Sequence, residues 1–236
     1  MKILTLSILS LFSFKSFGQN SFGVEFGTTF YTFTGVNDLD SIRVGMNGTD
    51  WGEGFGGVFY DVQLTSKFSI HNKLLIRPIL LDYSVYNYQA QCLFCNVRKG
   101  TVIGVTNISL EVLPQVVVLK NMRFKIKIFG GLNSSFNFTS ENRDISFNGR
   151  NPGVALVLNS LDEVVRPVTF SYIYGASIEY SRFIFWWKYQ TNSRFSDTIN
   201  VSGTEYEFKN NWEFLTLSIG YRLYSLRLKK NRDDGG

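Results

Sequence analysis

Apolar and polar residues alternate over three segments in the C-terminal third of the chain. The apolar positions are Phe170, Tyr172, Tyr174, Ala176, Ile178 and Tyr180, then Phe183, Phe185, Trp187 and Tyr189, then Leu215, Leu217, Ile219, Tyr221 and Leu223. A period of two residues is typical of a β-strand with one apolar face. Lipid offers no partners to backbone polar groups, so strands can cross a membrane only as a closed barrel. Because strands of about ten residues with one apolar face are typical of such barrels, the pattern predicts a transmembrane β-barrel.

Eight strand segments can be placed along the chain, and the connections between them alternate between short and long. The predicted strands are Phe22–Phe33, Phe55–Thr65, Ile70–Tyr88, Thr101–Leu119, Arg123–Phe138, Phe170–Tyr180, Phe183–Tyr189 and Leu215–Leu223. The predicted long loops are Thr34–Gly52, Gln89–Gly100, Thr139–Pro167 and Ser196–Asn210. Outer-membrane barrels combine short periplasmic turns with long extracellular loops. We therefore predict an all-β, eight-stranded antiparallel up-and-down barrel in a bacterial outer membrane, with both termini periplasmic; a soluble β-sandwich is the alternative.

One strand leaves its orientation open. Residues Leu74–Leu81 are apolar on both faces of the predicted strand Ile70–Tyr88. Since alternation is the only signal that distinguishes lumen from lipid, the register of this strand stays undecided.

The two ends of the chain have distinct compositions. Lys2, an apolar run and the small residues around Phe17 predict a signal peptide over residues 1–18. The run is shorter than the roughly 20 residues that a transmembrane helix needs. We expect the barrel over residues 19–228 and a polar, solvated periplasmic tail over residues 229–236.

Nine charged residues fall on the predicted inward faces. They are Glu25, Asp61, Arg77, Glu111, Lys125, Lys127, Glu179, Lys188 and Arg222. The interior of an eight-stranded barrel is just filled by side chains, and isolated charges there would be costly. The sequence therefore predicts a plug of ion pairs, with a narrow proton or ion path as the alternative.

Catalytic motifs are scarce. The only histidine, His71, lies beside a predicted periplasmic turn, away from the long loops. The sequence contains no nucleophile elbow, phosphate-binding Walker loop or zinc-ligand spacing. We predict a non-enzymatic protein with no catalytic residue, cofactor or metal site; a barrel enzyme that modifies lipid is the less favoured alternative.

Two cysteines, Cys92 and Cys95, lie in one predicted loop. An exported protein meets an oxidising environment, which favours a disulfide between them. Two free thiols are the alternative.

The predicted loop between Thr139 and Pro167 contains apolar residues at helical spacing. They are Val154, Val157, Leu158, Leu161, Val164 and Val165. Such a stripe has to be buried, either as a lid over the barrel mouth or against another protein. The sequence does not decide between the two.

Four segments resemble a known family. Leu75–Tyr83 is similar to its third strand, Leu110–Pro114 to its "LEIP" strand, and Phe129–Gly131 and Leu217–Leu223 to further strands. The family is the small outer-membrane β-barrel domain of Bacteroidota, which includes PorT-like proteins. The resemblance implies the barrel fold and, as in PorT, a role in type IX secretion, and it transfers no catalytic residue. This chain departs from the family by continuing beyond Tyr224.

These observations predict a structural or accessory subunit of a larger outer-membrane assembly for secretion or import. We expect contacts with outer-membrane lipid and lipopolysaccharide and with other outer-membrane proteins, and none with nucleic acid. The alternative is a stand-alone barrel that binds a small hydrophobic or lipidic ligand at its extracellular mouth.

Overall fold

The computed structural model describes residues 20–39, 42–47, 53–87, 99–140 and 152–226. The predicted signal peptide (1–18), the cysteine pair Cys92 and Cys95, and the predicted tail (229–236) lie outside the described residues. None of the helices in the described ranges has the length and apolarity needed to cross a membrane.

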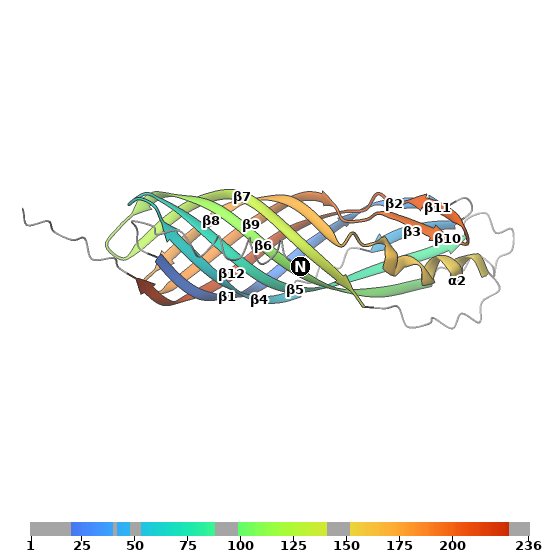
Figure 1. Ribbon diagram of the computed structural model, residues 1–236, viewed down its shortest axis with the longest axis horizontal. Coiled ribbons are helices and arrows are strands. Elements are labelled where there is room, and N and C mark those ends of the chain that lie inside the picture. Colours follow the sequence, from blue (N-terminus) through green and yellow to red (C-terminus); the bar gives the residue numbers. More distant parts are fainter. Residues whose placement is uncertain (1–19, 40–41, 48–52, 88–98, 141–151, 227–236) are drawn as a thin grey trace, which may run out of the picture.

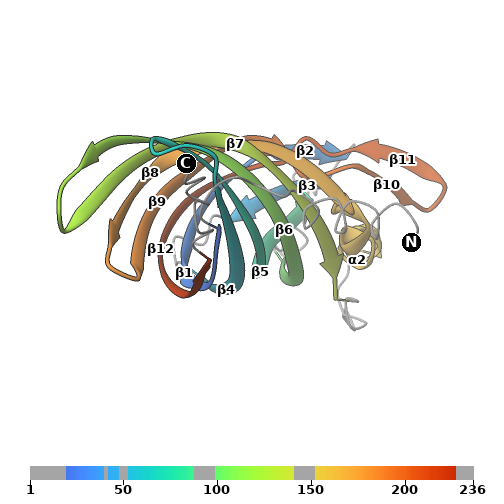
Figure 2. The same cartoon turned by 60° about the vertical axis from the view of Figure 1, so that its left-hand side comes forward.

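Eight antiparallel strands close into a ring. They are β1 (Asn20–Thr34), β4 (Glu53–Gln63), β5 (Phe68–Asn87), β6 (Lys99–Lys120), β7 (Phe124–Thr139), β8 (Val168–Tyr180), β9 (Phe183–Arg194) and β12 (Asn211–Leu226). Sequence neighbours pair around the ring, and β1 pairs with β12 to close it (Figures 1 and 2). The predicted eight-stranded up-and-down barrel is confirmed.

The outer surface of the ring is apolar. Side chains predicted to face lipid, such as Phe26, Leu132 and Phe170, are exposed on this surface. The structure also settles the register of β5, which the sequence left open, since Leu74, Ile76 and Leu80 point outward. The opposite register would place Lys73 and Arg77 in lipid, where neither would have a carboxylate partner.

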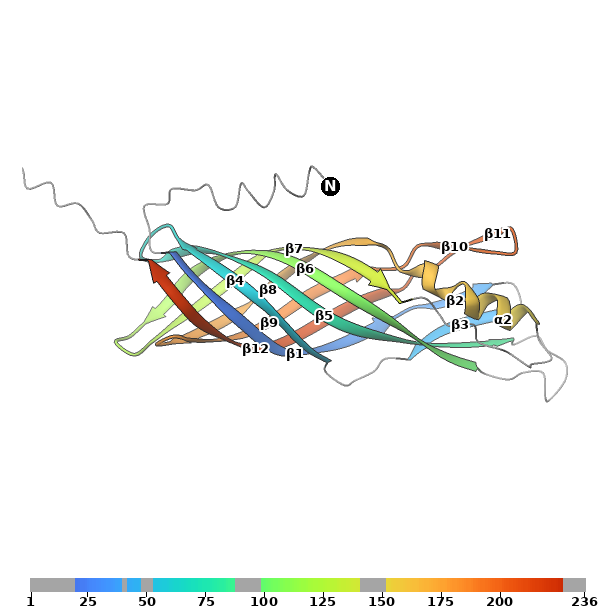
Figure 3. The same cartoon turned by 60° about the horizontal axis from the view of Figure 1, so that its bottom comes forward.

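The two ends of the barrel differ (Figure 3). At one end, called the turn end, three tight connections join the strands at residues 64–68, 121–124 and 181–182. The opposite end, called the extended end, carries β2 (Val36–Leu39), β3 (Ile42–Asn47), β10 (Thr198–Val201), β11 (Thr204–Glu207), helix α2 (Pro152–Asn159) and the 3-10 helix η1 (Leu161–Val164). The predicted long connections Thr34–Gly52 and Ser196–Asn210 each contain a short hairpin, β2–β3 and β10–β11, which the sequence did not predict.

The wall is taller than a membrane. Strand β6 has 22 residues, which gives about 70 Å at about 3.3 Å per residue. A strand needs only about 9–11 residues to cross a bilayer. The extended end therefore stands well clear of the apolar span.

The extended end contains the largest hydrophobic core of the described residues, called the end core. It joins residues of β1, β5, β6 and β12 to those of α2, η1 and the β10–β11 hairpin. Phe195 and Trp212 stack at 4.5 Å between ring centroids near its centre. Packed hydrophobic side chains thus fill this end of the barrel.

Candidate functional site: the barrel interior

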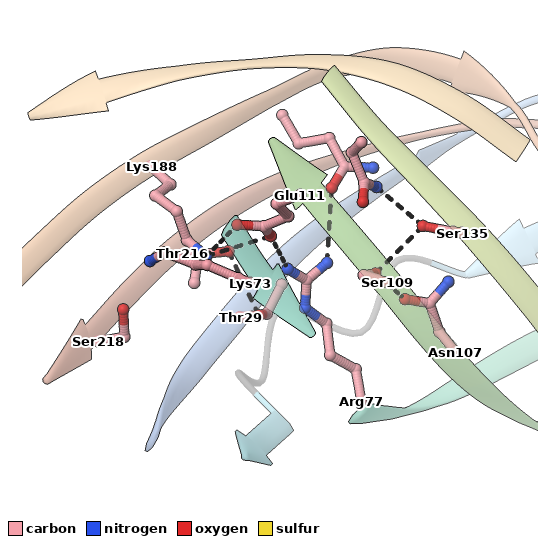
Figure 4. Close-up of polar contacts among 12 residues, drawn as sticks. Thr29, Lys73, Arg77, Asn107, Ser109, Glu111, Ser135, Lys188, Thr216 and Ser218 are labelled. Carbon is pink, nitrogen blue, oxygen red and sulfur yellow. Dashed lines mark hydrogen bonds and ion pairs between the residues drawn. The ribbon is translucent and has the colours of Figure 1, made fainter. Parts of the chain in front are cut away.

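Five charged residues form an ion-pair group in the middle of the barrel, called the central cluster: Glu25, Lys73, Arg77, Glu111 and Lys188. Lys73 Nζ lies 2.6 Å from Glu25 Oε2, and Arg77 Nη2 lies 2.6 Å from Glu111 Oε1. Lys188 Nζ bridges the two carboxylates: it lies 3.0 Å from Glu111 Oε2 (Figure 4) and 3.4 Å from Glu25 Oε1. The residues come from β1, β5, β6 and β9, so the cluster ties distant parts of the wall together.

A ladder of amides and hydroxyls continues the polar interior beside the central cluster. Asn107 Nδ2 donates to Asn137 at 2.6 Å, and Ser109 Oγ donates to Asn107 at 2.6 Å. Ser109 also lies 3.1 Å from Ser135 (Figure 4). These side chains pair with one another, whereas Asn133 Oδ1 on the neighbouring part of β7 is buried without a partner.

An apolar layer lies next to the central cluster on its turn-end side. It consists of Phe59, Leu113, Phe129, Ile173, Ile184 and Trp186. Along β9, the buried residue of the central cluster is Lys188. The next buried residues toward the turn end are Trp186 and Ile184, which are apolar. Lys73 Nζ sits 3.6 Å from the ring centroid of Trp186, a cation–π contact where the two regions meet.

A second ion-pair group lies just inside the opening of the barrel at the turn end. It is called the mouth cluster after that opening, which is at the opposite end from the long loops. It consists of Asp61, His71, Lys125, Lys127, Glu179 and Arg222. Lys127 pairs with Glu179 and lies 3.7 Å from Asp61 Oδ2. Arg222 Nη2 lies 3.3 Å from Glu179 Oε1 and 4.0 Å from Asp61 Oδ2.

All nine charged residues expected in the lumen have ion-pair partners inside the barrel, although Lys125 stands at the rim with its side chain 37% exposed. Two members were missed, Lys73 and His71, because the register of their strand was undecided. The signal was present in the sequence. Residues 71 and 73 share one face with Arg77, which was already placed inside.

His71 lies in the lumen rather than at an accessible surface. Its ring packs 4.9 Å from the ring of Phe59 and 5.3 Å from that of Trp186, and its Nδ1 is 3.8 Å from Asp61 Oδ1. The side chain is 1% exposed. This position offers no route for a lipid headgroup to the imidazole. No group of three or more metal-ligating side chains occurs in the described part of the chain.

The apolar stripe of α2 and η1 faces inward. Val154, Val157, Leu158, Leu161, Val164 and Val165 are all buried in the end core, with 0–8% exposure. The six residues therefore do not form the exposed partner surface considered from the sequence, because the barrel's own strands and β10 cover them. Helix α2 lies along the strands of the extended end and packs against β5 and η1 (Figure 1).

Comparison with known proteins shows similarity in fold but not in sequence. No family model and no curated protein matches the chain. The solved structures that resemble it include the outer-membrane protein OprG from Pseudomonas aeruginosa, with 11% identity over 88% of this chain and 96% of OprG and a TM-score of 0.51. Others are AlkL in lipid bilayers (8% identity, 92% and 95% coverage, TM-score 0.48) and E. coli outer membrane protein W (11%, 89% and 100%, TM-score 0.40). At such identity the likeness concerns architecture alone: the chain has the fold of small outer-membrane β-barrels.

Proposed function

We propose that this protein is a non-enzymatic barrel of the outer membrane that serves as a structural or accessory subunit of a larger outer-membrane assembly. The observation that carries the proposal is the filled interior. The end core, the central cluster, the apolar layer and the mouth cluster follow one another along the barrel axis. A barrel filled in this way can organise neighbours in the membrane, but it is poorly suited to conducting solutes.

The orientation belongs to the same proposal. Tight turns face the periplasm in outer-membrane barrels, and elaborated connections face outward. We therefore place the turn end and both termini in the periplasm. Secretion of the type IX kind, expected from the PorT-like resemblance, is one form that the assembly could take, and import is another.

The elaborated extended end supports a role in contacts with other proteins. Once α2 and η1 have buried their apolar stripe, Leu156 still points outward with 47% exposure, and Val36 on β2 is 65% exposed. The β10–β11 hairpin at the same end exposes polar side chains, such as Glu205 and Glu207. Arg194 Nη1 lies 2.9 Å from Glu207 Oε1, and this hydrogen bond lowers the pKa of the Glu207 carboxyl.

The proposal is tested by purifying the tagged protein from its native membranes in a mild detergent and identifying co-purifying proteins by mass spectrometry. We expect stoichiometric outer-membrane partners that are lost from the variant Val36→Asp/Leu156→Asp. The control is Met122→Asp, which introduces one negative charge, where the test variant introduces two, on a fully exposed apolar side chain at the turn end. A lone barrel carrying bound lipid would instead favour the alternative, a binder of hydrophobic ligands, whose site would lie in the apolar extended end.

The filled interior makes a second prediction. The wild-type protein in a planar lipid bilayer should show no steady ion conductance, because paired charges and an apolar layer leave no continuous water path. Single-channel recording checks this, with a 16-stranded porin as the positive control. A reproducible ohmic conductance would contradict the closed lumen and with it the accessory role.

A further inference from the structure

The turn end carries an excess of positive charge. Among the described residues, the exposed or partly exposed charged side chains at this end are all basic: Lys67, Lys120, Arg123, Lys125, Arg182 and Arg222. Exposed carboxylates lie at the extended end instead, on Asp38, Glu163, Asp197, Glu205 and Glu207. Among the described residues, the acids near the turn end are Asp61 and Glu179, which are buried in the mouth cluster. The described part of the turn end therefore presents a net positive charge to its surroundings.

A pocket opens at the turn end above the mouth cluster. Its cavity volume is about 30 Å³, which holds about two water molecules before the open part of the pocket begins. Four cationic side chains line it, those of Lys67, Lys125, Lys127 and Arg222, together with the two carboxylates of Asp61 and Glu179.

The carboxylates of the pocket are already engaged. Lys127 and Arg222 each contact both Asp61 and Glu179. Lys125 Nζ reaches Glu179 Oε2 only at 3.7 Å. With four cations and two carboxylates in the lining, about two positive charges remain uncompensated, and they are held at the rim by Lys67 and Lys125.

The hydroxyl groups of the lining are arranged as donors. Ser21 Oγ accepts a hydrogen bond from Arg222 Nε, and Ser69 Oγ accepts one from Lys127 Nζ. Thr65 Oγ1 accepts from the backbone N–H groups of residues 67 and 68. Each of these hydroxyl groups also has one O–H hydrogen, which can rotate to donate to a ligand in the pocket. Surplus cations together with donor hydroxyls select an anion with several acceptor oxygens.

We propose that this turn-end pocket binds a phosphate-bearing anion, with Lys67 and Lys125 as its direct cationic contacts and the mouth cluster as its rigid base. A phosphate offers oxygens on several sides, which suits ammonium groups and hydroxyls that converge from β1, β5, β7 and the β4–β5 turn. The same chemistry occurs in free phosphate and in the headgroup of an anionic phospholipid. The site does not depend on the proposed accessory role.

The test uses the full mature protein refolded in a maltoside detergent, which itself carries no phosphate. Inorganic phosphate is titrated and followed by ³¹P NMR, and retention of phosphatidylglycerol against phosphatidylcholine is measured in parallel by native mass spectrometry. The pocket variant is Lys67→Gln/Lys125→Gln. The matched control is Lys120→Gln/Arg123→Gln, which removes the same charge from the same end outside the pocket. Heat-modifiable migration verifies that each variant is folded.

We expect saturable binding of one of the two probes that weakens about tenfold or more in the pocket variant, because two cationic hydrogen-bond donors are removed. The control variant should bind like wild type. Binding of inorganic phosphate identifies a free phosphorylated ligand, and selective retention of phosphatidylglycerol alone identifies a lipid headgroup. Equal loss in both variants would reduce the effect to diffuse surface charge and overturn the site. Binding of neither probe would also overturn it.

Discussion

Replacing Glu111 with leucine should destabilise the folded barrel by about 3–5 kcal/mol, the usual cost of leaving buried charges without their partner. Glu111 is fully buried and contacts both Arg77 and Lys188. Glu25 can still pair with Lys73 and Lys188, but Arg77 would retain only a long hydrogen bond of 3.5 Å to Gln190. The loss is measured by urea unfolding in lipid vesicles, followed by tryptophan fluorescence.

Two further variants separate the role of burial from the loss of charge alone. Lys125→Gln removes a charge at the partly exposed rim, where an ion pair contributes about 0–1 kcal/mol. Arg77→Leu/Glu111→Leu removes both partners of one pair and should cost less than the sum of the two single substitutions. If Glu111→Leu costs no more than Lys125→Gln, water must reach the central cluster, and the interior is not the closed plug described above.

The barrel itself could be predicted from the sequence because lipid imposes a strict pattern. Outward residues such as Phe26 and Phe170 have to be apolar. Within each strand, the polar residues that alternate with such apolar residues then have to point inward. That rule places Glu111 and Lys188 in the lumen from strands far apart in the chain. It says nothing about which carboxylate meets which cation, since that depends on how the ring closes.

The alternation of apolar outward and polar inward residues does not apply to the parts of the chain that lie outside the membrane. The β2–β3 and β10–β11 hairpins are short and stand clear of the apolar span, so no long alternation marks them. The helical spacing of Val157 and Leu161 identified an apolar face, but periodicity alone cannot say whether a barrel or a partner covers it. The apolar layer was missed for a related reason, because Phe59 and Trp186 occupy inward positions where the rule expects polar residues.

A sign of that layer was present in its glycines. A Cβ atom on Gly220 would fall on the ring of Trp186, and one on Gly23 would fall on the ring of Phe59. Large inward rings thus face positions without a side chain. The alternation of large and absent side chains across a lumen is a packing signal that hydrophobicity patterns do not contain.

Gly131→Ala should destabilise the barrel by about 3 kcal/mol or prevent its refolding, because overpacking against backbone atoms cannot be relieved by a change of rotamer. A Cβ atom on Gly131 would fall on the carbonyl oxygen of Val112 and lie 3.0 Å from Leu113 Cα. The neighbouring Gly130 is the matched control, since its added Cβ would meet only the Ile173 carbonyl oxygen at 3.8 Å. Gly130→Ala should therefore change the free energy of unfolding by less than about 1 kcal/mol, in either direction. The two variants are compared by refolding yield, from heat-modifiable migration, and by urea unfolding. Similar behaviour of both would mean that β6 and β7 approach each other less closely than described, and that the lumen beside Leu113 has room the closed-barrel proposal does not allow.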